Sequence, residues 1–317
     1  MSRFAGCRSG RETVGVPVLR YAPAHPLDTR RTLWTLRRGG GDPAFMNDER
    51  GIWCTARTSA GPATLLISGG GGADPLECET WGPGAEAFLA SVPGMLGAHD
   101  DPAGFAPQHP LLRDLARRYP GIRVTRTGRV FEALVPAVLE QKVTGLEARR
   151  SWRWLMSRYG EPAPGPGPAA LRVCPAPEAW TRIPSWDWHR AGVDGKRSRT
   201  IIAAARVAPA LERTLALADG AAIAAALKVV PGIGVWTAAE IAQRAHGDAD
   251  AVSVGDYHLS NHVGYALTGH RVDDDVMLEL LEPYRPHRYR VQRLIEVGAP
   301  RPPAFGPKMS VTSYASF

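Results

Sequence analysis

The chain has 317 residues, of which 44% are hydrophobic, and is therefore long enough for two or three domains with buried cores. Lysine and arginine number 38 against 31 aspartates and glutamates, and the net charge of +7 fits either a polyanionic partner or an unspecialised basic surface. No apolar run has the length of a signal sequence or a membrane span, which argues against a membrane protein and leads us to expect a cytoplasmic one.

The four cysteines predict free thiols. They are Cys7, Cys54, Cys78 and Cys174, and no two of them form a C-x-x-C pair. This spacing argues against a zinc site and against a four-cysteine iron–sulfur cluster. We therefore expect no metal and no cofactor, and we expect the thiols to be kept in a reducing compartment.

The N-terminal third predicts a small antiparallel sheet domain at residues 18–104, after a flexible start at residues 1–17. Short β-rich runs alternate there with Gly-rich turns, and an amphipathic helix at Glu86–Leu96 could cover one face of the sheet. The predicted strands are Thr32–Leu36, Ile52–Arg57, Ala63–Ser68 and Glu77–Trp81.

Residues 105–298 predict a mostly α-helical body, which places the whole chain in the α+β class. The proline-rich residues 161–171 predict an exposed linker, and residues 299–317 predict an irregular tail. The predicted helices are Leu111–Arg118, Gly128–Val143, Leu146–Tyr159, Pro177–Arg182, Arg197–Leu211, Ala221–Val229, Val235–Ala245, Asp256–Leu267, Asp273–Leu281 and Arg288–Val297.

A tight turn, Val230–Gly234, joins two of these helices and predicts a helix-hairpin-helix. Its glycines, Gly232 and Gly234, allow a close backbone approach or a φ angle that a β-carbon forbids. The N–H groups that open the second helix have no partner inside it, and such a helix start can hold a phosphate. Taken by itself, the turn fits an ordinary helical corner equally well.

Three segments carry a resemblance to a known family. The first begins at Leu227 with LKVVPGIGVWTA and ends with an Asp-Tyr pair shortly before Leu259. The second is Pro120–Trp154, with the string PGIRVTRTGRVFEALVPAVLEQKVTGLEARRSWRWL, and the third is Glu282–Arg288, EPYRPHR. In these segments the chain resembles the helix-hairpin-helix DNA glycosylase superfamily, and within it the 3-methyladenine-DNA glycosylase II branch. The resemblance covers residues 105–298 well and the N-terminal part loosely, where some members of the branch carry a small sheet domain.

The resemblance matches Asp256 to the catalytic aspartate of the family. The bond between deoxyribose and a base breaks through an oxocarbenium-like sugar, which a nearby ionised carboxylate stabilises. From its position before a predicted helix alone, Asp256 would fit an N-cap. The nearby Asp248 and Asp250 fit turn residues better than catalysts.

Trp236 decides the predicted subclass. Superfamily members that also cut the strand carry a lysine near the start of the second hairpin helix, where it forms a Schiff base with the sugar. Because Trp236 stands in that place, the resemblance implies a monofunctional glycosylase. Trp236 and Tyr284 match positions that line the base pocket, where electron-rich rings stack on a positively charged base, although either could instead be a core residue. Glu240 stands where some members have an aromatic residue, which leaves the substrate range open.

Family members fill the space left by a flipped nucleotide with a side chain that follows a glutamine. Here Gln141 is followed by Lys142 in place of an apolar wedge, and a solvated helix end is the alternative interpretation. Basic residues in the same part of the chain are candidates for phosphate contacts. They are Arg149, Arg150, Arg153, Lys196, Arg197 and Arg199.

The sequence thus predicts a monomeric, monofunctional DNA glycosylase that flips alkylated purines out of double-stranded DNA and hydrolyses the N-glycosidic bond. Two alternatives stay open: a helix-hairpin-helix protein that binds DNA without enzymatic activity, and a glycosylase for another damaged base. Asp256 favours an enzyme, because a protein that only binds DNA need not retain it. The predicted DNA-binding residues are Gly232, Gly234, Gln141 and Lys142.

Overall fold

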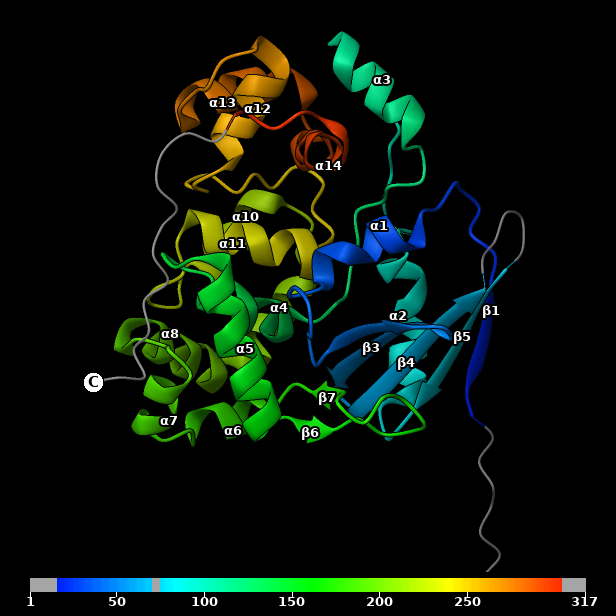
Figure 1. Cartoon of the computed structure of the whole chain (residues 1–317), viewed down its shortest axis with the longest axis vertical. Helices are drawn as coiled ribbons and strands as arrows, with labels where there is room; N and C mark the ends of the chain where they lie inside the picture. The colour runs from blue at the N-terminus through cyan, green and yellow to red at the C-terminus, as the bar shows by residue number, and fades with distance from the viewer. Residues whose placement is uncertain (1–15, 70–74, 304–317) are drawn as a thin grey trace, which may run out of the picture.

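The computed structural model describes residues 16–69 and 75–303, in which a five-stranded antiparallel sheet is followed by a helical region (Figure 1). The fold therefore belongs to the α+β class, as predicted. Residues 299–303 have no regular secondary structure. The rest of the predicted tail, from residue 304, lies outside the described residues, and so do residues 1–15 of the predicted flexible start, with Cys7.

The sheet has the strand order β1-β5-β4-β3-β2, and every neighbouring pair is antiparallel. Its strands are β1 (Val18–Tyr21), β2 (Phe45–Asp48), β3 (Gly51–Thr58), β4 (Gly61–Gly69) and β5 (Leu76–Trp81). Helix α2 (Ala85–Met95) covers one face, where Phe88 and Val92 are buried in one cluster with Leu65 and Ile67 of β4. Three of the predicted strands and the predicted helix are confirmed, whereas β1 and β2 were not predicted.

The strand predicted at Thr32–Leu36 is wrong. This segment forms helix α1 (Thr29–Leu33) and a 3-10 turn at Trp34–Leu36. Asp28 caps α1, because its Oδ1 accepts a hydrogen bond from the backbone N–H of Arg31 at 2.8 Å. A helix of five residues is too short to show helical periodicity, and its threonines favour a strand in a sequence pattern.

The predicted exposed linker, residues 161–171, is exposed at six of its eleven residues, but it also packs against the face of the sheet opposite α2. The short strands at its ends, which pair with each other, are β6 (Glu161–Pro162) and β7 (Arg172–Val173). Leu171 is buried in a cluster with Trp53. Glycine allows the close approach: a Cβ added to Gly165 would lie 2.5 Å from the ring of Trp81.

The helical region is built around α4, which is buried at every residue except Glu132. The helices that follow the sheet are α3 (Pro110–Arg118), α4 (Val130–Leu139), α5 (Gly145–Tyr159), α6 (Pro177–Thr181), α7 (Ser185–Arg190), α8 (Gly195–Arg206), α9 (Ala208–Glu212), α10 (Gly220–Leu227), α11 (Val235–Ile241), α12 (Leu259–Thr268), α13 (Asp274–Leu281) and α14 (Arg288–Gly298). One hydrophobic cluster surrounds α4, and a second joins α3, α12, α13 and α14. Within the two described ranges, no helix is both long and apolar enough to cross a membrane.

Several predicted helix boundaries differ from the observed ones. Helix α4 ends at Leu139, four residues earlier than predicted, and α12 begins only at Leu259. Helix α11 passes at Ile241 into a π-helical turn, Ala242–His246. The predicted helix Arg197–Leu211 is divided between α8 and α9, and α7 was not predicted.

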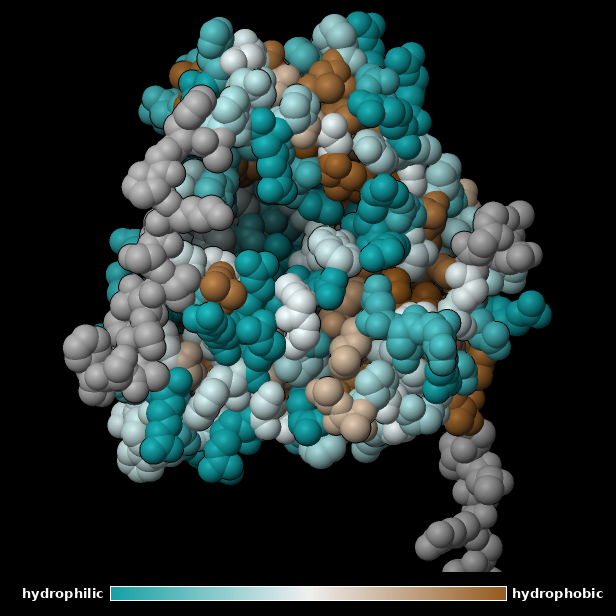
Figure 2. Space-filling model, in the orientation of Figure 1, coloured by the Kyte–Doolittle hydropathy of each residue, from teal (hydrophilic) through white to brown (hydrophobic). Residues whose placement is uncertain are grey.

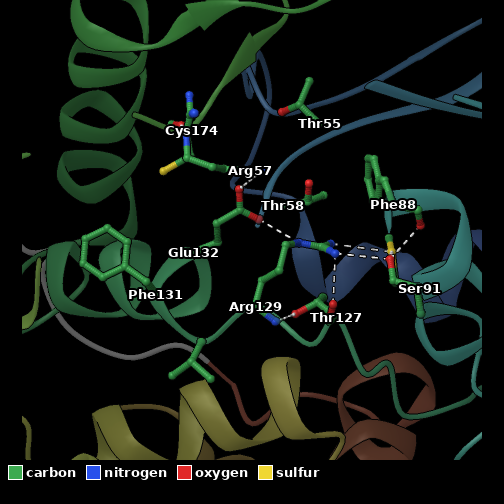
Figure 3. A network of polar contacts seen from close by, with 12 residues as sticks. Thr55, Arg57, Thr58, Phe88, Ser91, Thr127, Arg129, Phe131, Glu132 and Cys174 are labelled. Atoms are coloured by element: carbon green, nitrogen blue, oxygen red, sulfur yellow. Dashed lines mark hydrogen bonds and ion pairs between the residues drawn. The ribbon is translucent and has the colours of Figure 1, made fainter. Parts of the chain in front are cut away.

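A network of polar contacts joins the sheet to α4 (Figure 3). Glu132 accepts hydrogen bonds from the backbone N–H of Arg57 on β3 at 2.5 Å and from Nε of Arg129 at 2.8 Å. Arg57 donates from its own Nε to the carbonyl of Cys174 at 2.7 Å, and Arg129 donates to the hydroxyl of Ser91 on α2 at 3.3 Å. Burial raises the pKa of Glu132, and the charge of Arg129 opposes that shift. The sheet, α2, α4 and the segment after β7 therefore meet in one joint.

A cavity of about 80 Å³ lies at this joint, between the sheet and α4. Cys54 and Cys174 line it, and neither Trp236 nor Asp256 does. Burial raises the pKa of Cys54 to about 12, so that this thiol stays protonated. Both cysteines, and Cys78, are free and buried, which confirms the prediction of free thiols for these three.

Candidate functional site

The predicted hairpin is present as α10, the turn Lys228–Gly234 and α11. Gly232 has a φ of +94°, and a Cβ at this position would lie 2.0 Å from the hydroxyl of Thr200, so both the backbone angle and the space require glycine. Ile233 is buried in the cluster around α4 and anchors the turn. Gly234 is the N-cap of α11 and has an extended backbone, and nothing lies within 4 Å of a Cβ added there.

The structure brings Gln141 to the hairpin. Its Nε2 donates to the carbonyl of Gly232 at 3.0 Å and to the hydroxyl of Thr237 at 2.8 Å, and thereby ties the end of α4 to the turn and to the first turn of α11. Lys142 follows with a φ of +53° and is exposed. It is the one non-glycine residue with a positive φ in the part of the chain that the structure describes, and strain of this kind is characteristic of functional sites.

A loop between α11 and α12 carries Asp256, and contacts from three directions hold this loop. The backbone N–H of Gly255, whose φ is +88°, donates to Oδ2 of Asp274 in the first turn of α13 at 2.9 Å. Ser253 is buried and donates to Oε1 of Glu240 at 2.6 Å. Nε2 of Gln243 donates to the hydroxyl of Ser253 at 2.9 Å.

The carboxylate of Asp256 is fixed at both of its oxygens. Oδ1 accepts hydrogen bonds from the backbone N–H groups of His258 at 2.8 Å and Leu259 at 3.0 Å, at the start of α12. Oδ2 accepts one from Nε1 of Trp236 at 3.3 Å. Asp256, the predicted catalytic residue, and Trp236, the residue predicted to stack on the base, are therefore in direct contact. Asp256 makes the hydrogen bonds of a capping residue as well, but it lies in the loop rather than in the helix where it was predicted.

Glu240 lies in a buried ion pair that sequence reasoning missed. Its Oε2 lies 2.8 Å from Nη1 of Arg244, and both side chains are almost entirely buried. Burial by itself lowers the pKa of Arg244, but the charges of Glu240, Tyr289, Glu140 and Glu296 together outweigh that effect, so that the pKa of Arg244 lies above its ordinary value. Nε of Arg244 also donates to the carbonyl of Thr35 at 2.9 Å and joins α11 to the segment after α1. The spacing of the pair along one helix face was the available signal.

Tyr284 lies on a separate element. It lies in the 3-10 turn Glu282–Tyr284 and packs, partly buried, against the cluster of α12, α13 and α14. Within residues 16–69 and 75–303, no hydrogen bond or ring contact joins it to Trp236 or Asp256, so its place in a base pocket stays a prediction.

Asp248 and Asp250 are both structural. Oδ1 of Asp248 accepts hydrogen bonds from the backbone N–H groups of Asp250 and Ala251, which makes it a turn residue as predicted. Asp250 instead forms a two-pronged ion pair with Arg288, with Nε to Oδ1 at 2.9 Å and Nη2 to Oδ2 at 2.7 Å. It therefore fastens the loop of Asp256 to α14.

The prediction that Arg197 contacts a phosphate is wrong. It is buried, and its guanidinium donates to the carboxylate of Asp194 and to the carbonyls of Leu139 and Gly192. It therefore supports the end of α4, just before Gln141. Four of the other candidates are exposed: Arg149, Arg150, Lys196 and Arg199. Arg153 is half-buried and donates to the carbonyl of Gly40 at 3.0 Å.

The face of the molecule drawn in Figure 2 is hollowed between the lobe of α12, α13 and α14 at the top of the view and the helices α10 and α11 beneath it. The floor of this hollow is hydrophilic. Among residues 16–69 and 75–303, no group of three or more His, Cys, Asp or Glu side chains is arranged to hold a metal ion.

Solved structures of known proteins share the fold of this chain. The 3-methyladenine DNA-glycosylase from Archaeoglobus fulgidus matches with a TM-score of 0.71 at 14% identity, over 88% of this chain and 97% of that one. The Clostridium acetobutylicum 8-oxoguanine glycosylase/lyase, in complex with double-stranded DNA containing cytosine opposite 8-oxoG, matches with a TM-score of 0.67 at 14% identity, over 86% and 91% of the two chains. The chain therefore has the fold of the helix-hairpin-helix DNA glycosylases.

In sequence, the chain is 35% identical over 153 residues to the probable bifunctional transcriptional activator/DNA repair enzyme AlkA of Mycobacterium tuberculosis. The match covers 47% of this chain and 30% of that protein, so the chain spans less than a third of the relative's length. No family model matches the chain. The predicted resemblance to the helix-hairpin-helix DNA glycosylases is confirmed for the fold, and the similarity in sequence to AlkA supports the predicted branch.

Proposed function

We propose that this protein is a DNA glycosylase that releases alkylated purines from double-stranded DNA and leaves an abasic site. The observation that carries the proposal is the hydrogen bond between Trp236 and Asp256, which sets an aromatic ring beside a fixed carboxylate. A similarity in sequence to a DNA repair enzyme supports the same function.

In the proposed reaction, a nucleotide that has turned out of the duplex places its sugar beside Asp256. The negative charge of the carboxylate stabilises the oxocarbenium-like sugar as the base leaves and orients the water that attacks it. The N–H groups of His258 and Leu259 hold one carboxylate oxygen and the indole holds the other, so the charge needs no reorientation during the reaction. The face of Trp236 stacks on the base, most strongly when alkylation has made that base positively charged.

Trp236 also supports a glycosylase without strand-cutting activity. A Schiff base with the sugar needs an amine, and the position that holds a lysine in strand-cutting members of the superfamily holds Trp236 here. The sequence motifs do contain two lysines: Lys142 lies on the turn after α4, and Lys228 is the C-cap residue of α10.

The experiment that tests the proposal incubates the protein with duplexes that contain 3-methyladenine, 7-methylguanine, hypoxanthine or ethenoadenine. We expect free base from at least one alkylated duplex, an abasic site that hot alkali cleaves, and no covalent adduct after treatment with borohydride. Failure to release a base from any of these duplexes, with DNA binding intact, would favour the alternative of a DNA-binding protein without enzymatic activity. A borohydride adduct would contradict the monofunctional assignment.

The two hairpin glycines should respond differently to a larger side chain. Gly234→Val is expected to fold, because an added Cβ meets nothing within 4 Å, whereas Gly232→Val should unfold the turn. If the turn holds a phosphate through backbone N–H groups, Gly234→Val should weaken the binding of damaged and undamaged duplexes alike, by about tenfold, since such a contact reads no base. Titration of both duplexes measures this effect. Unchanged affinity in the folded variant would remove the hairpin from the interface.

Lys142 is the proposed wedge, since it projects from the strained turn after α4 that Gln141 fastens to the hairpin. Lys142→Ala should therefore slow excision from a fully paired duplex more than from a mismatched one, where turning the base out costs less. We expect a difference of about tenfold between the two duplexes, which is about 1.4 kcal/mol. Arg150→Ala, which removes another exposed charge from the neighbouring helix α5, is the matched control. Equal slowing on both duplexes would make Lys142 a phosphate contact instead.

A further inference from the structure

An exposed tryptophan lies between two arginines beside the hairpin helix. Trp34, in the 3-10 turn after α1, is 43% exposed, although large aromatic side chains are usually covered. The guanidinium carbon of Arg37 lies 4.5 Å from the centre of its ring, and that of Arg30 lies 5.7 Å away. We call these three residues the Arg-Trp-Arg patch.

The arginines of the patch keep their hydrogen-bonding edges free. Within residues 16–69 and 75–303, neither Arg30 nor Arg37 forms an ion pair or a side-chain hydrogen bond, unlike the neighbouring Arg31, which pairs with Asp28. An aromatic ring can hold a guanidinium group by the flat face of the guanidinium, while the N–H groups of the guanidinium point outward along its edges. Held in this way, the two arginines lose little conformational entropy when they bind an oxyanion, and phosphate is the oxyanion that their fork geometry fits.

The patch is fixed relative to the candidate site. Arg244, in the π-helical turn that follows α11, donates to the carbonyl of Thr35, the residue after Trp34, and Figure 1 draws α1 beside this end of α11. From Val235 at the start of α11 to Arg244, the rise of a helix gives about 14 Å. A duplex advances by about 3.4 Å per base pair, so this separation corresponds to about four base pairs in length.

We propose that the Arg-Trp-Arg patch is a second DNA contact, which binds backbone phosphates away from the damaged nucleotide. The inference rests on the proposed function in one respect, that DNA is the partner. It gives the sheet region a role of its own, because the patch belongs to the N-terminal part of the chain and not to the hairpin. The contact reads no base, so it acts on damaged and undamaged DNA alike.

The test compares the binding of an undamaged 20-base-pair duplex at several salt concentrations by the parent and by Arg30→Ala/Arg37→Ala. Loss of two phosphate contacts should raise Kd by roughly tenfold at 0.1 M salt and should lower the slope of log K against log salt by about 2. Trp34→Phe keeps an aromatic face for the guanidinium groups and should bind nearly as the parent does, whereas Trp34→Ala should lose part of the affinity.

The matched control is Arg50→Ala/Arg158→Ala, which removes the same charge and two arginines that also lie against aromatic rings, those of Trp53 and Tyr159. Equal weakening by both double variants, or an unchanged salt slope in Arg30→Ala/Arg37→Ala, would overturn the proposal. The result is separable from the proposed function. If no base is released from any duplex but the patch variants alone weaken binding, the patch stands and the glycosylase assignment falls.

Discussion

Asp256→Asn is expected to slow the release of a methylated purine by at least about 100-fold under single-turnover conditions, while damaged DNA still binds. Stabilisation of charge in a transition state by one preorganised group is commonly worth about 3 kcal/mol or more, and tenfold in rate corresponds to about 1.4 kcal/mol. Asparagine keeps the size of the side chain and the oxygen that accepts from His258 and Leu259, but it lacks the charge. A rate within a few-fold of the parent would make Asp256 a capping residue and nothing more.

One contact of Asp256 does change in this variant, and it needs a control. The side-chain N–H groups of asparagine would face the indole N–H of Trp236, so a hydrogen bond is lost together with the charge. Trp236→Phe removes the same hydrogen bond and keeps both the carboxylate and an aromatic face. We expect this variant to lose far less activity than Asp256→Asn. If both variants were equally slow, the orientation of the carboxylate, rather than its charge, would be the main contribution.

Glu240→Ala is expected to lower the free energy of unfolding by about 3–5 kcal/mol, the largest stability effect that we predict. The substitution leaves the buried guanidinium of Arg244 without its carboxylate partner and the hydroxyl of Ser253 without its acceptor. Denaturant titration measures the change.

Glu282→Ala is the matched control for this prediction, because the side chain of Glu282 is more than half exposed in its ion pairs with Arg285 and Arg288. Exposed pairs contribute less than about 1 kcal/mol. A similar, small loss in both variants would contradict the view that Glu240 and Arg244 stabilise the fold around the loop of Asp256.

The sequence predicted best where a local pattern had one structural solution. Gly232 of the hairpin turn is an example, since it has both a positive φ and no space for a side chain, whereas Gly234 has neither constraint. Strands β3, β4 and β5 likewise followed from alternating residues between Gly-rich turns. The neighbouring positions of Trp236 and Asp256 followed from the family motif, and no local pattern predicted them.

Errors arose where tertiary contacts decided the outcome. Arg197 has the composition of a surface residue, but three acceptors from the end of α4 and the loop before α8 bury it. The proline-rich residues 161–171 lack periodicity, but their glycines let the backbone lie against the tryptophans of the sheet. The sequence showed only that Glu240 stands where some family members have an aromatic residue. Its hydrogen-bond partner Ser253 is too distant in sequence for a local pattern to connect the two.

Because the Asp256 loop and the hairpin turn are held by different contacts, evolution can change one of them without the other. The hairpin turn takes its shape from Thr200 and Gln141, whereas the loop depends on Ser253 and on Asp274 of α13. The two parts thus rest on separate sets of residues. A lineage could lose the anchors of the loop and keep an intact hairpin, so that a repair enzyme of this fold could become a DNA-binding module through a few substitutions far from the turn.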